Sequence, residues 1–296
     1  MIKETARMSA SKADLNRKIF DWLGIAPFML FALMFLVVPT LYLVTGAFQN
    51  AAGEWTLENI RGLFTDKILA SFSISIRISL ASALGGALIG FLMSWALVLG
   101  GLPSWVRSLV LTFCGVASNF AGVPLAFAFL ATLGRMGLVT LLLRDWFGIN
   151  LYATGFNLLS FLGLTLTYMY FQIPLMVLIV TPAIDGLRKE WREAAEILGA
   201  NIFQYWTKVA LPILFPSIMG SFLLLFANAF GAIATAYALT GSSLNIVPIQ
   251  LYAQIRGDVL HDPHLGYALA LGMIVITGVS NVIYILLRMR AERWQK

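Results

Sequence analysis

The sequence predicts an all-α integral membrane protein with six transmembrane helices. The chain is 59% hydrophobic and only 11% charged, whereas about a quarter of the residues in a soluble domain are charged. Its charge-free runs are also long, and about 20 apolar residues are enough for a helix to cross a hydrocarbon layer of about 30 Å. These runs are residues 27–53, 78–106, 108–134, 146–184, 209–255 and 263–287.

We expect a membrane domain over residues 25–288, between tails at 1–24 and 289–296, with one longer polar loop at 185–210. The apolar run behind the first tail is too long for the core of a signal peptide, so this tail is expected to lead into a retained span. The expected spans are residues 25–47, 70–99, 107–133, 158–182, 211–239 and 264–288.

The distribution of Lys and Arg predicts the orientation. Fourteen of the 20 lie in the two tails, the second loop and the fourth loop, and five lie in the other loops. Because cytoplasmic loops carry the excess of cations, both termini and the loop 185–210 are predicted to be cytoplasmic. The net charge of +6 then follows from membrane topology and attraction to lipid headgroups, and no nucleic-acid partner is needed to explain it.

The second span carries two stripes of small residues, which let helix backbones approach closely. Their members are Ser82, Gly86, Gly90 and Ser94, and Ser71, Ser75, Ser79 and Ala83. The same span contains Arg77, the one deeply placed charge, which either extends to the outer surface or lines a polar cavity. Prolines within or at the ends of spans either bend the helices or are tolerated there. They are Pro39, Pro124, Pro174 and Pro216.

The outward loops predict short helices and no metal site. The segment from Thr56 to Asp66 can form a surface helix with Thr56 as its N-cap, and GLVTLLLRDWFG, residues 137–148, is amphipathic and suits the membrane surface. His261 and His264 flank Asp262. These residues could hold a metal, but the arrangement fits better with Asp262 as the N-cap of the last span.

Enzyme motifs are absent from the sequence. It contains no G-x-S-x-G, no H-E-x-x-H and no G-x-x-x-x-G-K-[ST] phosphate loop, and no acid lies deep in an expected span. We therefore predict no catalytic residues, no metal and no cofactor bound by this chain, and no ATP hydrolysis by it. The lack of a buried acid also disfavours a proton-coupled carrier. Cys114 is the single cysteine, so no intrachain disulfide is possible.

The polar loop predicts an amphipathic helix that lies along the cytoplasmic surface. From Leu187 the apolar positions recur with helical spacing through Trp191 to Leu198. Gly199 can adopt the left-handed conformation that ends a helix. A second short segment follows, and Leu211-Pro212 begins the fifth span. On these grounds alone the helix is either an ordinary interfacial helix or a contact for another protein.

The residues of this loop resemble the signature of permease subunits of binding-protein-dependent type I ABC importers. Glu193-Ala194-Ala195 is followed after three residues by Gly199, and then by Val209, Leu211 and Pro212 at the spacing of the family motif. Val209 stands where isoleucine is commoner. Six spans and cytoplasmic termini agree with the resemblance, which covers roughly residues 20–290.

This resemblance implies that separate subunits form the pathway, hydrolyse ATP and deliver the solute. The helix with Glu193 would dock on an ABC ATPase, with Glu193 as the polar contact, Ala194 and Ala195 as the close-packing surface and Gly199 as the turn. Two ATPase copies would bind ATP and Mg, and a second permease, a paralogue or another copy of this chain, would complete the pathway. A solute-binding protein would deliver the cargo, and the complex would lie in a bacterial inner membrane.

The cargo is less well defined. Residues Phe226 to Val259 resemble permeases of the spermidine/putrescine-type branch, which favours a polyamine or a related small organic solute. Phosphonate and iron are alternatives, and a gradient-driven carrier or channel is the competing class. Polar, aromatic and charged groups in the spans either line the pathway, where tyrosines can offer cation–π faces, or form interhelical hydrogen bonds. They are Arg77, Tyr168, Tyr170, Gln172, Asn228, Thr235 and Tyr237.

Overall fold

The computed structural model describes residues 24–256 and 262–292, and in these residues the only regular secondary structure is helical. An isolated β-bridge joins Gln49 to Trp55. The helices are η1 (Leu33–Val37), α2 (Val38–Gly46), α3 (Glu58–Gly62), α4 (Asp66–Leu99), α5 (Ser104–Asn119), α6 (Val123–Leu133), α7 (Leu138–Phe147), α8 (Phe161–Asp185), α9 (Lys189–Ile197), α10 (Ile202–Tyr205), η2 (Trp206–Ala210), α11 (Leu211–Phe230), α12 (Ile233–Thr240), α13 (Val247–Arg256) and α14 (Pro263–Glu292).

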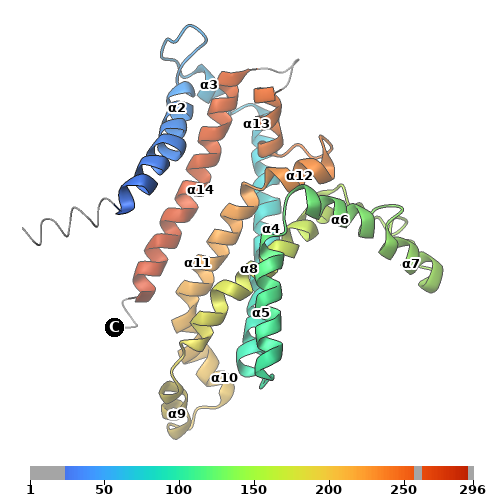
Figure 1. Ribbon diagram of the computed structural model, residues 1–296, viewed down its shortest axis with the longest axis vertical. Helices are drawn as coiled ribbons and strands as arrows, with labels where there is room; N and C mark the ends of the chain where they lie inside the picture. Colours follow the sequence, from blue (N-terminus) through green and yellow to red (C-terminus); the bar gives the residue numbers. More distant parts are fainter. Residues whose placement is uncertain (1–23, 257–261, 293–296) are drawn as a thin grey trace, which may run out of the picture.

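The centre of the molecule is a bundle in which α4, α8, α11 and α14 run along the long axis (Figure 1). Helix α4 packs most extensively on α8, and α11 packs on both α14 and α4. Six helical stretches in the described residues are long and apolar enough to cross a membrane. The predicted fold class of six membrane helices is therefore confirmed.

Both small-residue stripes of α4 are buried, as the sequence predicts. An added Cβ on Gly86 would lie 2.8 Å from Cβ of Gln172, and one on Gly90 would lie 2.6 Å from Cβ of Met176. The backbones of α4 and α8 thus approach so closely that a methyl group does not fit between them.

The third predicted span, residues 107–133, is not one continuous helix. It divides into α5 and α6 at Phe120–Gly122, where Gly122 adopts a φ of 76°. By length and hydropathy the third stretch is Val123–Phe147. However, α5 lies along α8 whereas α6 and α7 turn away from the bundle (Figure 1). The part of this region that runs with the bundle is therefore α5, and α7 forms the separate amphipathic helix expected for residues 137–148.

The fifth predicted span, residues 211–239, is also broken. Helix α11 ends at Phe230, and α12 begins at Ile233 in a new direction (Figure 1). The other spans agree with prediction within a few residues, although α14 continues to Glu292, into the segment expected to be a tail. The helix α13 in the last outer loop was not predicted.

The first helical stretch, Gly24–Gly46, stands apart from the bundle. Its main contact is with α14 and lies close to the C-terminal end of the first stretch. There the rings of Tyr42 and Tyr267 meet edge to face, with their centroids 5.9 Å apart. The first stretch runs from about mid-height toward the end of the molecule where α3 lies, and α14 runs the other way, toward the end where α9 lies (Figure 1). The two helices are therefore antiparallel, as the first and the last of six spans should be.

The short loop features follow local capping chemistry. Thr56 accepts a hydrogen bond from the Glu58 N–H at 3.1 Å, and α3 begins one residue later than the predicted cap implies. Asp262 accepts from the N–H groups of His264 and Leu265, both at 3.1 Å, so its predicted role as the cap of the last span is confirmed. The described residues hold no metal-ligand cluster, and His261 lies outside them.

Candidate functional site: a cytoplasmic helix–turn–helix and a pocket between broken helices

Helix α9 ends in a Schellman motif at Gly199. The N–H of Gly199 donates to the carbonyl of Glu196 at 3.0 Å, and the N–H of Ala200 donates to the carbonyl of Ala195 at 2.9 Å. Gly199 has a φ of 76°, which is the left-handed conformation that glycine adopts without strain. The predicted role of Gly199 as the end of the helix is confirmed.

A capping box starts the helix that follows. The Asn201 side chain accepts from the N–H of Gln204 at 2.8 Å, and the Gln204 side chain accepts from the N–H of Asn201 at 2.9 Å. The π-helical segment η2 then leads into α11, whose first two residues are Leu211 and Pro212. Because Pro212 has no N–H and its ring crowds the carbonyl four residues earlier, the helical hydrogen bonds change to the wider π pattern just before it. The turn at Gly199 and the π-helical segment η2 together fix the angle between α9 and α11.

The two alanines of the motif face in different directions. Ala195 is buried against Tyr205 and Ala210 of the same chain, whereas Glu193 and Ala194 are exposed. Ala195 therefore holds α9 on the body of the protein, and the outward surface of the motif consists of Glu193 and Ala194. The sequence interpretation had placed both alanines on the partner-facing surface.

Apolar side chains surround this surface, and of these the sequence interpretation named only Leu198. Leu198 is 86% exposed and Phe203 is 75% exposed, although both are large and apolar. Exposed Ile197 and Ile202 lie beside them along the chain. Helix ends with such side chains in a cytoplasmic loop are typical of a protein–protein contact. The signal was present in the sequence as apolar residues on both sides of the glycine turn.

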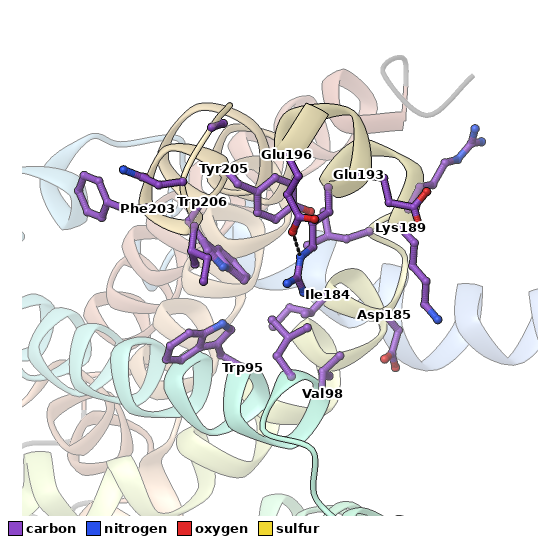
Figure 2. Close-up of a pocket in the computed structure, with 17 residues that line it drawn as sticks. Trp95, Val98, Ile184, Asp185, Lys189, Glu193, Glu196, Phe203, Tyr205 and Trp206 are labelled. Atoms are coloured by element: carbon purple, nitrogen blue, oxygen red, sulfur yellow. Dashed lines mark hydrogen bonds and ion pairs between the residues drawn. The ribbon is translucent and has the colours of Figure 1, made fainter. Parts of the chain in front are cut away.

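A groove of about 1110 Å³ lies between this helix pair and the end of α4. Trp95 of α4 and Trp206 of η2 meet edge to face at 5.9 Å on one side of it. Arg192 and Glu196 form an ion pair at 2.9 Å above the groove. Figure 2 shows this pair between the two tryptophans and Glu193, whose carboxylate points away from the groove.

A second, smaller pocket of about 360 Å³ lies where the two broken helices meet. It is lined by both interruptions, Ala121–Gly122 and Gly231–Ala232, and by Asn119 and Asn228. No charged side chain lines it. The backbone ends of four helices converge here, and such ends carry polar groups without intrahelical partners. Irregular backbone within a membrane is tolerated where it lines a polar cavity, so this pocket is the candidate solute site.

Two hydrogen bonds hold the interruptions together. The N–H of Gly122 donates to the Thr235 hydroxyl at 2.7 Å, which joins the α5–α6 break to α12. The Tyr168 hydroxyl donates to the carbonyl of Ala232 at 2.6 Å, which joins the α11–α12 break to α8. Both side chains are 2% exposed. Thr235 also lines the pocket. Tyr168 is not among the lining residues, and it positions the Ala232 carbonyl, which belongs to the pocket wall.

The other predicted pathway residues are spread over the protein. Gln172 is fully buried and donates to the Ser82 hydroxyl at 3.2 Å, which is an interhelical contact. Tyr170 packs edge to face on Phe129. Tyr237 is 48% exposed on α12. Arg77 is exposed on α4. Of the seven predicted pathway residues, only Asn228 and Thr235 line the pocket, and Asn119 and Ser118 were not predicted.

Six membrane-length helices, a polar pocket where two of the helical stretches are broken, and a glycine turn at one end of the bundle are features of the membrane subunit of a solute transporter. Residues 75–294 match the family described as the binding-protein-dependent transport system inner membrane component. The chain belongs to this family, so it is a permease subunit of an ABC importer for small solutes.

Curated relatives come from several transport systems. The chain is 25% identical over 197 residues to the molybdenum transport system permease protein ModB of Escherichia coli, covering 66% of this chain and 82% of that one. It is 26% identical over 224 residues to the sulfate transport system permease protein CysT of the same species, covering 74% and 75%. It is 25% identical over 285 residues to the spermidine/putrescine permease protein PotB of Haemophilus influenzae, covering 90% of each.

A solved structure shares the fold. A chain of a bacterial ABC transporter involved in the import of the acidic polysaccharide alginate superposes with a TM-score of 0.68 and 18% identity, covering 96% of this chain and 99% of that chain.

Proposed function

We propose that this permease couples to a separate ABC ATPase through the exposed face of α9. The observation that carries the proposal is the turn at Gly199, which presents Glu193, Ala194 and Leu198 to the cytoplasm from a helix held by Ala195. Two ATPase copies would bind ATP and Mg, and a second permease, either a paralogue or another copy of this chain, would complete the pathway in a bacterial inner membrane.

The coupling is tested with the reconstituted complex of permeases, ATPase and binding protein. Glu193→Ala should remove most ATP-dependent uptake while the protein stays in the membrane, because it deletes the charged contact. Glu190→Ala, in the first turn of the same helix and also exposed, is the matched control and should transport normally. Undiminished uptake by Glu193→Ala would contradict the coupling role. Uptake by this chain without any ATPase would indicate a gradient-driven carrier or a channel.

For the solute, we infer that a small oxyanion fits better than a polyamine. The pocket offers side-chain amides and hydroxyls, whose N–H and O–H groups can donate to an oxyanion, and no carboxylate among its lining residues neutralises a polycation. Two of the relatives above belong to molybdenum and sulfate systems. A polyamine is the second candidate, because the relative from the spermidine/putrescine system matches 90% of the chain.

The solute is identified on the solute-binding protein that would deliver it, since that protein would select the cargo. Calorimetric titration with molybdate, sulfate, spermidine and putrescine separates the two candidates. Tight binding of an oxyanion supports the first, and tight binding of a polyamine overturns it. Uptake of the bound solute by wild-type protein, and its loss in Asn228→Leu, would then connect the pocket to transport.

A further inference from the structure

An ion pair joins two helices at the cytoplasmic end of the bundle. The Arg107 guanidinium, in the first turn of α5, donates to the carboxylate of Asp185, the last residue of α8. Their side chains are 35% and 39% exposed. Helix α8 leads within four residues into α9, and α5 leads in the other direction to the pocket at Asn119. The pair is therefore the direct polar contact between the helix before the coupling helix and the helix that ends at the pocket.

Both charges stand at the helix end that disfavours them. A helix carries partial positive charge at its N-terminus and partial negative charge at its C-terminus. Arg107 lies at the N-terminal end of α5, and Asp185 lies at the C-terminal end of α8. The reverse arrangement would stabilise both helices. The stability of the individual helices therefore does not account for this placement, and the two charges depend on each other.

The contact is also a weak one. Partly exposed ion pairs contribute little to stability because water screens them. Asp185 faces the open groove beside α9, and in Figure 2 its carboxylate points away from the Arg192–Glu196 pair. A contact of this kind can break when α9 moves, without loss of the fold.

We propose that Arg107 and Asp185 form a releasable tie that holds α5 to α8 in this conformation and opens when α9 is displaced. The pair thereby positions the α5 end of the pocket according to the position of α9. The proposal rests on the proposed coupling role of α9 and adds the route from that helix to the pocket.

Charge exchange tests the tie. Arg107→Asp with Asp185→Arg keeps the attraction between the two helices, whereas Arg107→Asp alone replaces it with a repulsion. In nanodiscs and without the solute-binding protein, the single variant should hydrolyse ATP severalfold faster than wild type, and the exchanged pair should return hydrolysis to the wild-type rate. The exchange should also raise the unfolding temperature of the complex, because each charge then stands at the helix end that favours it. Wild-type hydrolysis by the single variant, or no recovery in the exchanged pair, would overturn the proposal.

Loss of the tie is tested with Arg107→Gln combined with Asp185→Asn. This variant should hydrolyse ATP severalfold faster than wild type without the binding protein, because α9 moves against less resistance. The matched control is Arg144→Gln with Asp145→Asn, which removes an exposed pair of 2.8 Å on α7, away from both α9 and the pocket. Unchanged basal hydrolysis in the first variant would overturn the tie. The wild-type complex tests the proposed function separately: if its hydrolysis does not respond to the binding protein, the coupling role itself fails.

Discussion

At the scale of single residues, Gly90 shows how tightly the bundle is packed. A Cβ added there would lie 2.6 Å from Cβ of Met176 and 2.8 Å from the carbonyl oxygen of Ile173, and neither atom belongs to a flexible chain end. We expect Gly90→Ala to destabilise the protein by about 1–3 kcal/mol, the usual cost of overpacking. Thermal unfolding in detergent measures this loss.

Gly115 of α5 is the control for this substitution, because a Cβ added there meets nothing within 4 Å. Gly115→Ala should be neutral or slightly stabilising, since alanine favours helix more than glycine does. Equal unfolding temperatures for the two variants would show that α4 and α8 are less closely packed than the structure indicates.

Tyr168 is a second residue with a specific role, since its hydroxyl serves the carbonyl of Ala232 at the α11–α12 break. Tyr168→Phe removes this hydrogen bond to a partly buried carbonyl, which costs about 0.5–1.5 kcal/mol. We expect a lower unfolding temperature and slower solute uptake. Tyr170→Phe is the comparison, because the Tyr170 hydroxyl makes no hydrogen bond within the described residues and its ring contacts remain. Similar behaviour of both variants would argue against the role of Tyr168.

At the scale of elements, the turn after α9 determines the direction of the coupling surface. Gly199→Ala meets no neighbouring atom, so its whole effect comes from the φ of 76°, at a cost of about 1–2 kcal/mol for a residue with a side chain. We expect reduced ATP-dependent uptake, because α9 changes its angle or the turn loosens.

Gly148 provides a control for this turn. It ends α7 with a φ of 66° and has nothing within 4 Å of an added Cβ. Gly148→Ala therefore introduces the same backbone strain at a distance from the coupling surface, and uptake should be normal. If both variants lose uptake equally, the effect is one of folding and not of coupling.

Elements also show what the sequence could and could not predict. Charge-free runs revealed the spans, and motif spacing located the turn at Gly199. The breaks at Phe120–Gly122 and Gly231–Ala232 lie inside uninterrupted apolar runs, so hydropathy does not detect them. Their polar backbone groups are satisfied by Thr235 and Tyr168, which are distant in the chain. Gly122 followed by Pro124 was the available local signal of a new helix start, but the pocket depends on tertiary contacts that no local pattern contains.

At the scale of the whole molecule, the orientation in the membrane is a prediction that can be tested directly. Fourteen of the 20 Lys and Arg residues lie on the side assigned to the cytoplasm, and the helix at Gly24–Gly46 runs antiparallel to α14, which ends toward α9. Ala52 and Ser104 are exposed at opposite ends of this arrangement, in the first outer loop and at the start of α5. A cysteine at either position should therefore react from only one side of the membrane.

The test uses right-side-out membrane vesicles and a maleimide that does not cross the bilayer. The background is Cys114→Ser, which removes the single native thiol; Cys114 is 1% exposed. Ala52→Cys should react in intact vesicles, and Ser104→Cys should react only after permeabilisation. The opposite result would reverse the topology and place α9 outside the cell, where ATP-driven coupling is impossible because the nucleotide and its ATPase are cytoplasmic. The orientation thus decides whether the Glu193–Gly199 segment can act as proposed, independently of any solute.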